Sequence, residues 1–126
     1  MLGAGSYQRI DGTCPFDERF ALLWDARAAA RVDAAVRKLE RGLRPDVRPV
    51  GEGVQEARID YWPGYRVYFG SDGTDLVVLL LCGDKRSQPD DVAFARVLWT
   101  EYRARKRSPK PGQQEALVLV RPKKDE

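Results

Sequence analysis

Residues 54–81, VQEARIDYWPGYRVYFGSDGTDLVVLLL, hold two alternating stretches followed by one unbroken apolar run. Apolar and polar side chains alternate over residues 54–61, and the alternation resumes at residues 65–69 after a Trp-Pro-Gly turn. Residues 76–81 are aliphatic throughout, which is typical of a central strand covered on both faces. The stretch therefore predicts three consecutive antiparallel strands.

The turn between the first two strands predicts their register. If residues 62–64 form a three-residue loop with Gly64 in the left-handed region, each cross-strand pair is fixed. The expected pairs are Tyr61–Tyr65, Ile59–Val67, Arg58–Tyr68 and Asp60–Arg66. We expect the last two pairs on a polar, exposed face of the sheet.

Upstream of these strands, the sequence predicts a short strand and two helices. Residues 7–10 suit a first strand, and Pro15 begins a helical pattern. Two sets of apolar residues at helical spacing follow, which predicts a helical hairpin or a kinked pair ending at Gly42. These sets are Phe16, Phe20, Leu23 and Trp24, and Val32, Val36 and Leu39. Residues 44–49 read as a loop.

Downstream of the central strand, Ser87 and Asp90 fit a capping box at the start of a last helix. One face of this helix is apolar and should pack on the sheet. That face consists of Val92, Ala95, Leu98, Trp99 and Tyr102. Together with Trp24 of the first helical set, Trp99 and Tyr102 are expected in the core.

The predicted order is an N-terminal strand and two helices, then a three-stranded antiparallel meander and a C-terminal helix. This is a small α+β domain over residues 1–107. Residues 108–126 form a basic tail that begins with the linker-like run SPKPGQQ. A solvated, disordered tail is the first interpretation, and an added edge strand is the alternative.

Composition excludes several classes of protein. The 126 residues hold 22 Lys and Arg against 19 Asp and Glu, so the net charge of +3 is only mildly basic. Histidine is absent, and no metal-ligand spacing occurs, so we expect no metal and no cofactor. Cys14 and Cys82 look like free thiols of a reducing compartment. With no apolar run of about 20 residues and no secretory signal, a cytoplasmic protein with no membrane contact is expected.

Basic side chains from three separate segments are predicted to converge on one surface. Arg58 and Arg66 share a sheet face, and Lys85 and Arg86 follow the central strand. Such a cluster repels itself unless an anion binds there. The plainer alternative is that the two strand arginines are surface charges beside Asp60, and that Lys85 merely flanks the helix.

A cluster of this kind suits phosphodiester chemistry. When the 2′-hydroxyl of RNA attacks its own phosphate, fixed cations stabilise the charge that grows on phosphorus. Tyr65 and Tyr68 could move a proton, although packing is the more ordinary role for each. With Trp62, these tyrosines could instead stack on RNA bases. Asp84 either orients a cation or is a turn residue.

The run VGEGVQEARIDYWPGYRVYF (residues 50–69), followed by LVVLLLCGDKRSQPDDVAFARVLW (residues 76–99), resembles the RelE/ParE toxin superfamily. The resemblance is strongest to the HigB-like addiction-module killer proteins, toxins of type II toxin-antitoxin systems. It covers roughly residues 7–106. Relatives usually carry two glycines before the aspartate, whereas this chain has CGDKRSQ, with one glycine and an added arginine.

The resemblance implies the small RelE-like fold and a ribosome-dependent endoribonuclease, or mRNA interferase. Such toxins cleave mRNA by metal-free 2′-hydroxyl attack and thereby inhibit translation and growth. By position, Arg66 would contact the reacting phosphate, and Lys85 and Arg58 would complete the catalytic set. Arg86 would join the RNA-binding residues.

The resemblance also implies partners: the ribosome with its mRNA, and a cognate antitoxin with a helix-turn-helix domain that binds operator DNA. Two alternatives remain open. A ParE-like protein would inhibit DNA gyrase without catalysis, and a catalytically inactive relative would only bind RNA.

Overall fold

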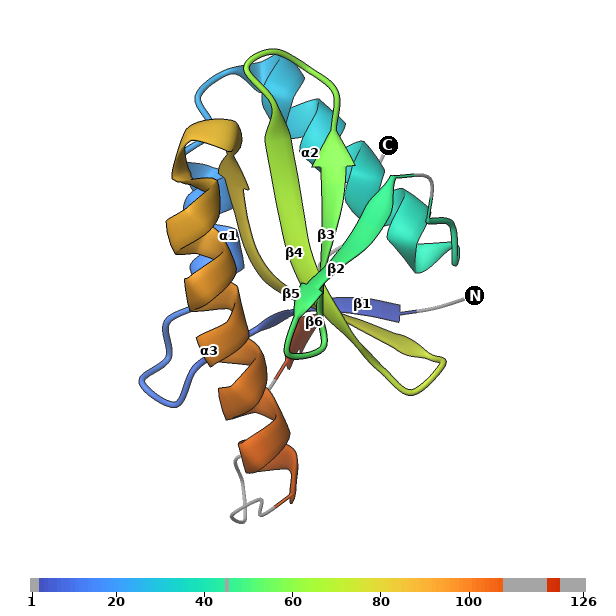
Figure 1. Cartoon of the computed structure of the whole chain (residues 1–126), viewed down its shortest axis with the longest axis vertical. Coiled ribbons are helices and arrows are strands. Elements are labelled where there is room, and N and C mark those ends of the chain that lie inside the picture. The colour runs from blue at the N-terminus through green and yellow to red at the C-terminus, as the bar shows by residue number, and fades with distance from the viewer. Residues whose placement is uncertain (1–2, 45, 108–117, 121–126) are drawn as a thin grey trace.

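The computed structural model describes residues 3–44, 46–107 and 118–120, which form one six-stranded sheet with helices on both faces (Figure 1). The strands run in the order β2-β3-β4-β5-β1-β6. Their bounds are β1 Gly3–Tyr7, β2 Val47–Gly51, β3 Val54–Ile59, β4 Tyr65–Asp72, β5 Leu76–Asp84 and β6 Val118–Val120. The helices are α1 Pro15–Ala21, α2 Ala26–Glu40, the 3₁₀ turn η1 Lys85–Ser87 and α3 Gln88–Arg107. The predicted α+β order is confirmed.

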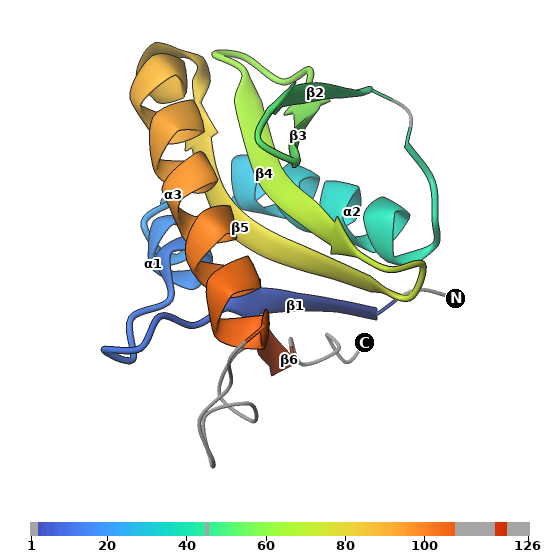
Figure 2. The ribbon, with the colours of Figure 1, turned by 60° about the horizontal axis from the view of Figure 1, so that its bottom comes forward.

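The sheet separates two apolar layers. Figure 2 shows α3 in front of the sheet and α2 behind it. Between the sheet and helices α1 and α2 lie buried side chains such as Phe16, Val36 and Phe69. Between the sheet and α3 lie others such as Tyr68 and Leu98. The core is thus split by the sheet, and each helix covers one face.

Strand β5 is the centre of the sheet, as its unbroken aliphatic run predicts. It pairs antiparallel with β4 and parallel with β1. Val77 and Leu79 face the layer of α1 and α2, whereas Val78 and Leu80 face α3. Because both faces are covered, only apolar side chains satisfy these positions.

Two strand assignments differ from the sequence-based expectation. The first strand is Gly3–Tyr7, not residues 7–10, and it pairs with Leu76–Leu79 of β5. Residues 47–49, expected as part of a loop over residues 44–49, belong to the edge strand β2, which pairs with β3 through Val47 and Ala57. Pro49 lies in β2, where an edge strand tolerates the missing donor.

The predicted hairpin register is wrong, because the connection between β3 and β4 spans residues 60–64 instead of three residues. Ile59 lies opposite Tyr65, and Arg58 lies opposite Arg66. In the same register Glu56 lies opposite Tyr68. The expectation of an exposed polar face holds for Arg58 and Asp60, which are exposed, and is wrong for Arg66 and Tyr68, which are buried.

The first two helices form the predicted pair, and Asp25 separates them. Its carboxylate accepts the backbone N–H groups of Arg27 and Ala28 and so caps α2. Trp24 is not in the core: it is 94% exposed, whereas Trp99 and Tyr102 are buried as expected. The α1–α2 connection thus turns its tryptophan toward solvent.

The start of α3 is organised by Asp84 instead of the predicted Ser87–Asp90 capping box. The Asp84 carboxylate accepts the backbone N–H groups of Arg86 and Ser87. The Ser87 hydroxyl donates to Asp91 Oδ2 at 2.6 Å. Asp84 is therefore a structural turn residue before the helix, one of its two expected roles.

The tail contributes one strand among the residues that the structure describes. Val118–Val120 form β6, which pairs antiparallel with β1. The edge-strand alternative is thus correct for these three residues, and the other expectations for residues 108–126 lie outside the described residues. No helix within the described ranges is long and apolar enough to cross a membrane.

Candidate functional site

A cavity of about 400 Å³ lies where the β3–β4 connection meets the 3₁₀ turn η1. Arg58, Arg66 and Lys85 all line it, so three cations from separate segments meet in space. The connection at residues 59–65 supplies most of the remaining wall, and Asp46 supplies a carboxylate. We call this hollow the basic cavity.

Local geometry explains why these cations converge. Arg58 and Arg66 are directly opposite in the β3–β4 pair, so their side chains leave the same face of the sheet. Lys85 follows β5, and its backbone N–H donates to the carbonyl of Gly64 at 3.0 Å. This hydrogen bond ties the loop after β5 to the connection between β3 and β4.

A buried carboxylate holds Arg66. Its Nε lies 3.4 Å from Glu56 Oε2, and the Arg66 and Glu56 side chains are 8% and 0% exposed. Glu56 also accepts from Arg48 Nε at 3.2 Å and from Gln88 Nε2 at 2.9 Å. No described residue accepts a hydrogen bond from the Nη atoms of Arg66. The inner Nε is buried and forms an ion pair with Glu56 without a hydrogen bond, and the outer nitrogens remain for a ligand.

Arg58 and Lys85 differ from Arg66 in being exposed. Within the described part of the chain, no carboxylate forms an ion pair with either side chain. Like charges opposite one another in a sheet destabilise it. Glu56 is the counter-charge of Arg66, and Asp46 and Asp60 line the same cavity. Because Arg58 and Lys85 have no ion pair with any of the described carboxylates, both are available to an anion in the basic cavity.

The two tyrosines named from the sequence lie on opposite faces of the sheet. Tyr65 is half-buried and stacks on Tyr61 with 6.4 Å between ring centroids. Burial raises the pKa of Tyr65, and the charges of Asp25 and Asp84 raise it further, so the phenol stays protonated at neutral pH. Tyr68 is completely buried under α3, so its ring has no open face for the expected stacking on RNA bases.

The remaining predicted residues lie at a neighbouring hollow of about 510 Å³, which we call the aromatic cleft. Arg86 lines this cleft and not the basic cavity, and it donates to Asp84 Oδ2 at 2.9 Å. Burial raises the pKa of Asp84, but hydrogen bonds from Arg86 outweigh this effect and leave it lowered. Trp62 lines both hollows.

Two important residues were missed from the sequence. Glu56 was not singled out from the sequence, although its position two residues before Arg58 is a signal that both side chains leave the same face of β3. Trp24 was placed in the core because it continues an apolar helical pattern, yet it lines the aromatic cleft. No group of three metal-ligating side chains occurs within residues 3–44, 46–107 and 118–120.

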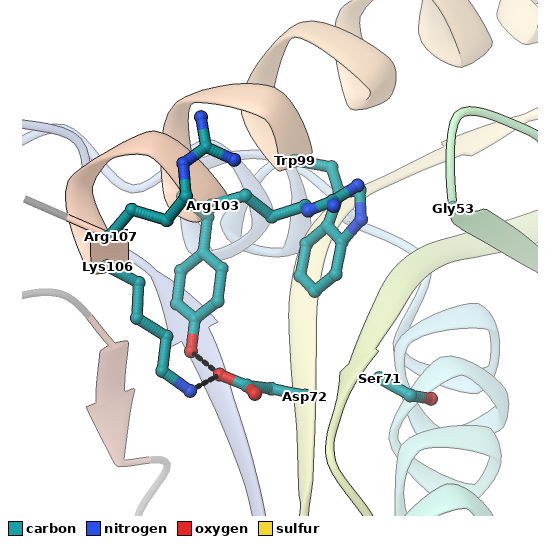
Figure 3. A pocket seen from close by; sticks show the side chains of 8 residues that line it. Gly53, Ser71, Asp72, Trp99, Arg103, Lys106 and Arg107 are labelled. Carbon is teal, nitrogen blue, oxygen red and sulfur yellow. Dashed lines mark hydrogen bonds and ion pairs between the residues drawn. The ribbon is translucent and has the colours of Figure 1, made fainter.

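A third hollow, of about 600 Å³, lies at the far end of α3 (Figure 3). Asp72 accepts from the Tyr102 hydroxyl at 2.5 Å and also from Lys106. Arg103 and Arg107 add two cations from the same helix. The described lining residues thus include three cations, all from the last turns of α3, and one carboxylate, which is paired with Lys106. In the basic cavity, by contrast, the three cations come from three separate segments.

Comparison with known proteins reveals one clear relative. No protein-family model matches the chain, and no solved structure matches it. An uncharacterized protein of Haemophilus influenzae is 38% identical over 93 residues, which cover 74% of this chain and 94% of that protein. At this identity and coverage, the chain belongs to the same family as the Haemophilus influenzae protein.

Proposed function

We propose that this protein is the toxin of a type II toxin-antitoxin module and acts as a ribosome-dependent endoribonuclease. The observation that supports this most is the basic cavity, where Arg58, Arg66 and Lys85 meet in one hollow that can hold a phosphate. Histidine is absent from the sequence, so any acid–base step uses other side chains. In this proposal the protein works in the cytoplasm, on mRNA bound to the ribosome.

Arg66 would bind the reacting phosphate through its outer nitrogens. Its Nε is buried and lies 3.4 Å from the Glu56 carboxylate, which supplies the counter-charge. A planar guanidinium grips two phosphate oxygens at once and stays protonated. Its contribution grows as charge develops on the five-coordinate phosphorus, which is the condition for lowering the barrier.

Proton transfer would use the exposed groups of the cavity. The 2′-oxygen attacks phosphorus while its proton passes to a carboxylate, and Asp46 and Asp60 are the carboxylates that line the cavity. The bond to the 5′-oxygen breaks, and the Lys85 ammonium supplies the proton that this leaving group needs. The products are a 2′,3′-cyclic phosphate and a free 5′-hydroxyl. Arg58 positions the strand through its phosphates.

The test is cleavage of mRNA on ribosomes by the purified protein and by three variants. Arg58→Ala, Lys85→Ala and Arg66→Lys should each slow cleavage, by about 10²- to 10³-fold where a donor to the phosphorane is lost. Arg66→Lys keeps a charge beside Glu56 but loses the fork, so it separates catalysis from folding. Lys38→Ala, an exposed change on α2, is the matched control.

Cleavage that is undiminished in all three variants would contradict the proposed roles. Gyrase inhibition with intact transcripts would instead assign the protein to the ParE-like class. Binding of RNA without any cleavage would identify an inactive relative. A cognate antitoxin with a helix-turn-helix domain is the expected partner, and it should suppress cleavage when it is added in equal amount.

A further inference from the structure

Two tryptophans stand in solvent beside the basic cavity. Trp24 is 94% exposed and Trp62 is 88% exposed, and both line the aromatic cleft. Trp24 belongs to the connection between α1 and α2, whereas Trp62 belongs to the connection between β3 and β4. Two segments far apart in the sequence thus place indole rings around one hollow.

This exposure is unusual for side chains of such size. Indole rings normally bury most of their surface, and a group of exposed large apolar side chains marks a binding surface. Leu22 adds to the same cleft and is 73% exposed. The fold packs its core without these three side chains, so they are available to a ligand.

The aromatic cleft continues into the basic cavity. Trp62, Pro63 and Tyr65 line both hollows and form their common wall. A chain that lies across this wall would meet cations on one side and flat rings on the other. Single-stranded nucleic acid has this alternation, because its phosphates are charged and its bases are flat.

The charged groups of the cleft are engaged in the fold. Asp25 caps α2, and Asp84 accepts hydrogen bonds from Arg86, whose side chain is 83% exposed. The cleft therefore offers rings for a base, and the phosphates of such a strand would be held by the cations of the adjoining basic cavity.

We propose that the aromatic cleft binds an unpaired RNA base next to the phosphate held in the basic cavity, with Trp24 and Trp62 as the stacking residues. This inference rests on the proposed function, since it names the RNA contact of the same site. The base is held by stacking, so the cleft tolerates different bases. Tyr65 on the common wall joins the base site to the phosphate site.

The test compares a short unstructured RNA with an abasic ribose-phosphate oligomer of the same length, in ribosome-free binding assays by fluorescence anisotropy. Loss of one stacking contact should weaken RNA binding by about 5- to 150-fold in Trp24→Ala and Trp62→Ala. Binding of the abasic oligomer should not change in these variants. Trp24→Phe should restore much of the affinity for RNA, because the ring returns.

The matched control is Ile10→Ala, which removes an apolar side chain that is 68% exposed and lies away from the cleft. Unchanged RNA binding in both tryptophan variants would overturn the inference, and so would an equal loss for the abasic oligomer. If the variants lose only inhibition by the antitoxin, the cleft is a protein-binding surface and the inference is wrong.

The two proposals fail in different ways. If the wild-type protein cleaves mRNA and depends on Arg58 and Lys85, the proposed function stands whatever the tryptophan variants do. If Trp24→Ala then cleaves with unchanged KM and kcat, only the base site is refuted. If the wild-type protein binds neither oligomer and cleaves nothing on the ribosome, both proposals fall.

Discussion

Replacing Glu56 by alanine removes the buried carboxylate that pairs with Arg66 of the basic cavity. Glu56 is completely buried and contacts Arg48, Arg66 and Gln88. The change leaves the Arg66 guanidinium without its counter-charge in a position that is 8% exposed. It also leaves the Gln88 amide without its acceptor.

The expected loss follows from the burial of each partner. Removing one member of a buried ion pair costs about 3–5 kcal/mol, because the remaining charge is uncompensated. Arg48 is 54% exposed, so its pair with Glu56 is screened by water and contributes about 0–1 kcal/mol. We therefore expect Glu56→Ala to destabilise the fold by about 3–5 kcal/mol and Arg48→Ala by less than about 1 kcal/mol.

Urea denaturation followed by circular dichroism measures both values, and Arg66→Met completes a double-mutant cycle with Glu56→Ala. Since the apolar pair leaves no buried charge, the double variant should be more stable than Glu56→Ala alone. Equal, small losses for Glu56→Ala and Arg48→Ala would refute the reasoning. So would a double variant whose loss is the sum of the two single losses.

Three further changes test other parts of the structure. Burial, followed by the charge of Glu56, raises the pKa of Tyr68 above that of an unfolded tyrosine. The protonated phenol therefore contributes stability that is present below about pH 10 and is lost as the pH rises further. Tyr68→Phe should flatten the alkaline decline in the free energy of unfolding. Hydrogen bonds, first from Lys106, lower the pKa of Asp72 below 3.8. The ionised Asp72 carboxylate therefore contributes to folding stability above about pH 3.8, and this contribution is lost as the pH falls. Asp72→Asn should reduce the drop in the urea midpoint that the wild-type protein shows at acid pH. In Gly83→Ala the new Cβ would lie 2.0 Å from Asp91 Oδ2, and overpacking of this kind should cost about 1–3 kcal/mol in urea denaturation. Wild-type pH dependence in the first two variants, or wild-type stability in the third, would contradict these predictions.

Much of the fold can be predicted from the sequence because the periodic segments are long. The aliphatic run of β5 predicts a central strand, and the apolar face of α3 predicts a helix packed on the sheet, and the structure has both. Strand β2 could not be predicted in the same way, since its five residues include a proline and only two are partly buried. The sequence also does not reveal how long the β3–β4 connection is, and this length decides the register.

The site could be predicted only in part. Arg58, Arg66 and Lys85 were expected together, and the structure brings all three to the basic cavity. The burial of Arg66 and Tyr68 was not expected, because alternation identifies the two faces of a strand but not which of them a helix covers. Trp24 was misplaced because the apolar pattern in the sequence continues to it, whereas helix α1 already ends at Ala21.

The parallel pairing of the first strand has a consequence for synthesis on the ribosome. Gly3 of β1 lies beside Leu76 of β5, so β1 has no partner among the described strands until the chain has grown by roughly seventy further residues. Lys85 emerges later still, after β5 is complete. Contacts between segments so distant in sequence form slowly. The nascent chain has no complete basic cavity until Lys85 has left the exit tunnel, because Lys85 is the last of its lining residues.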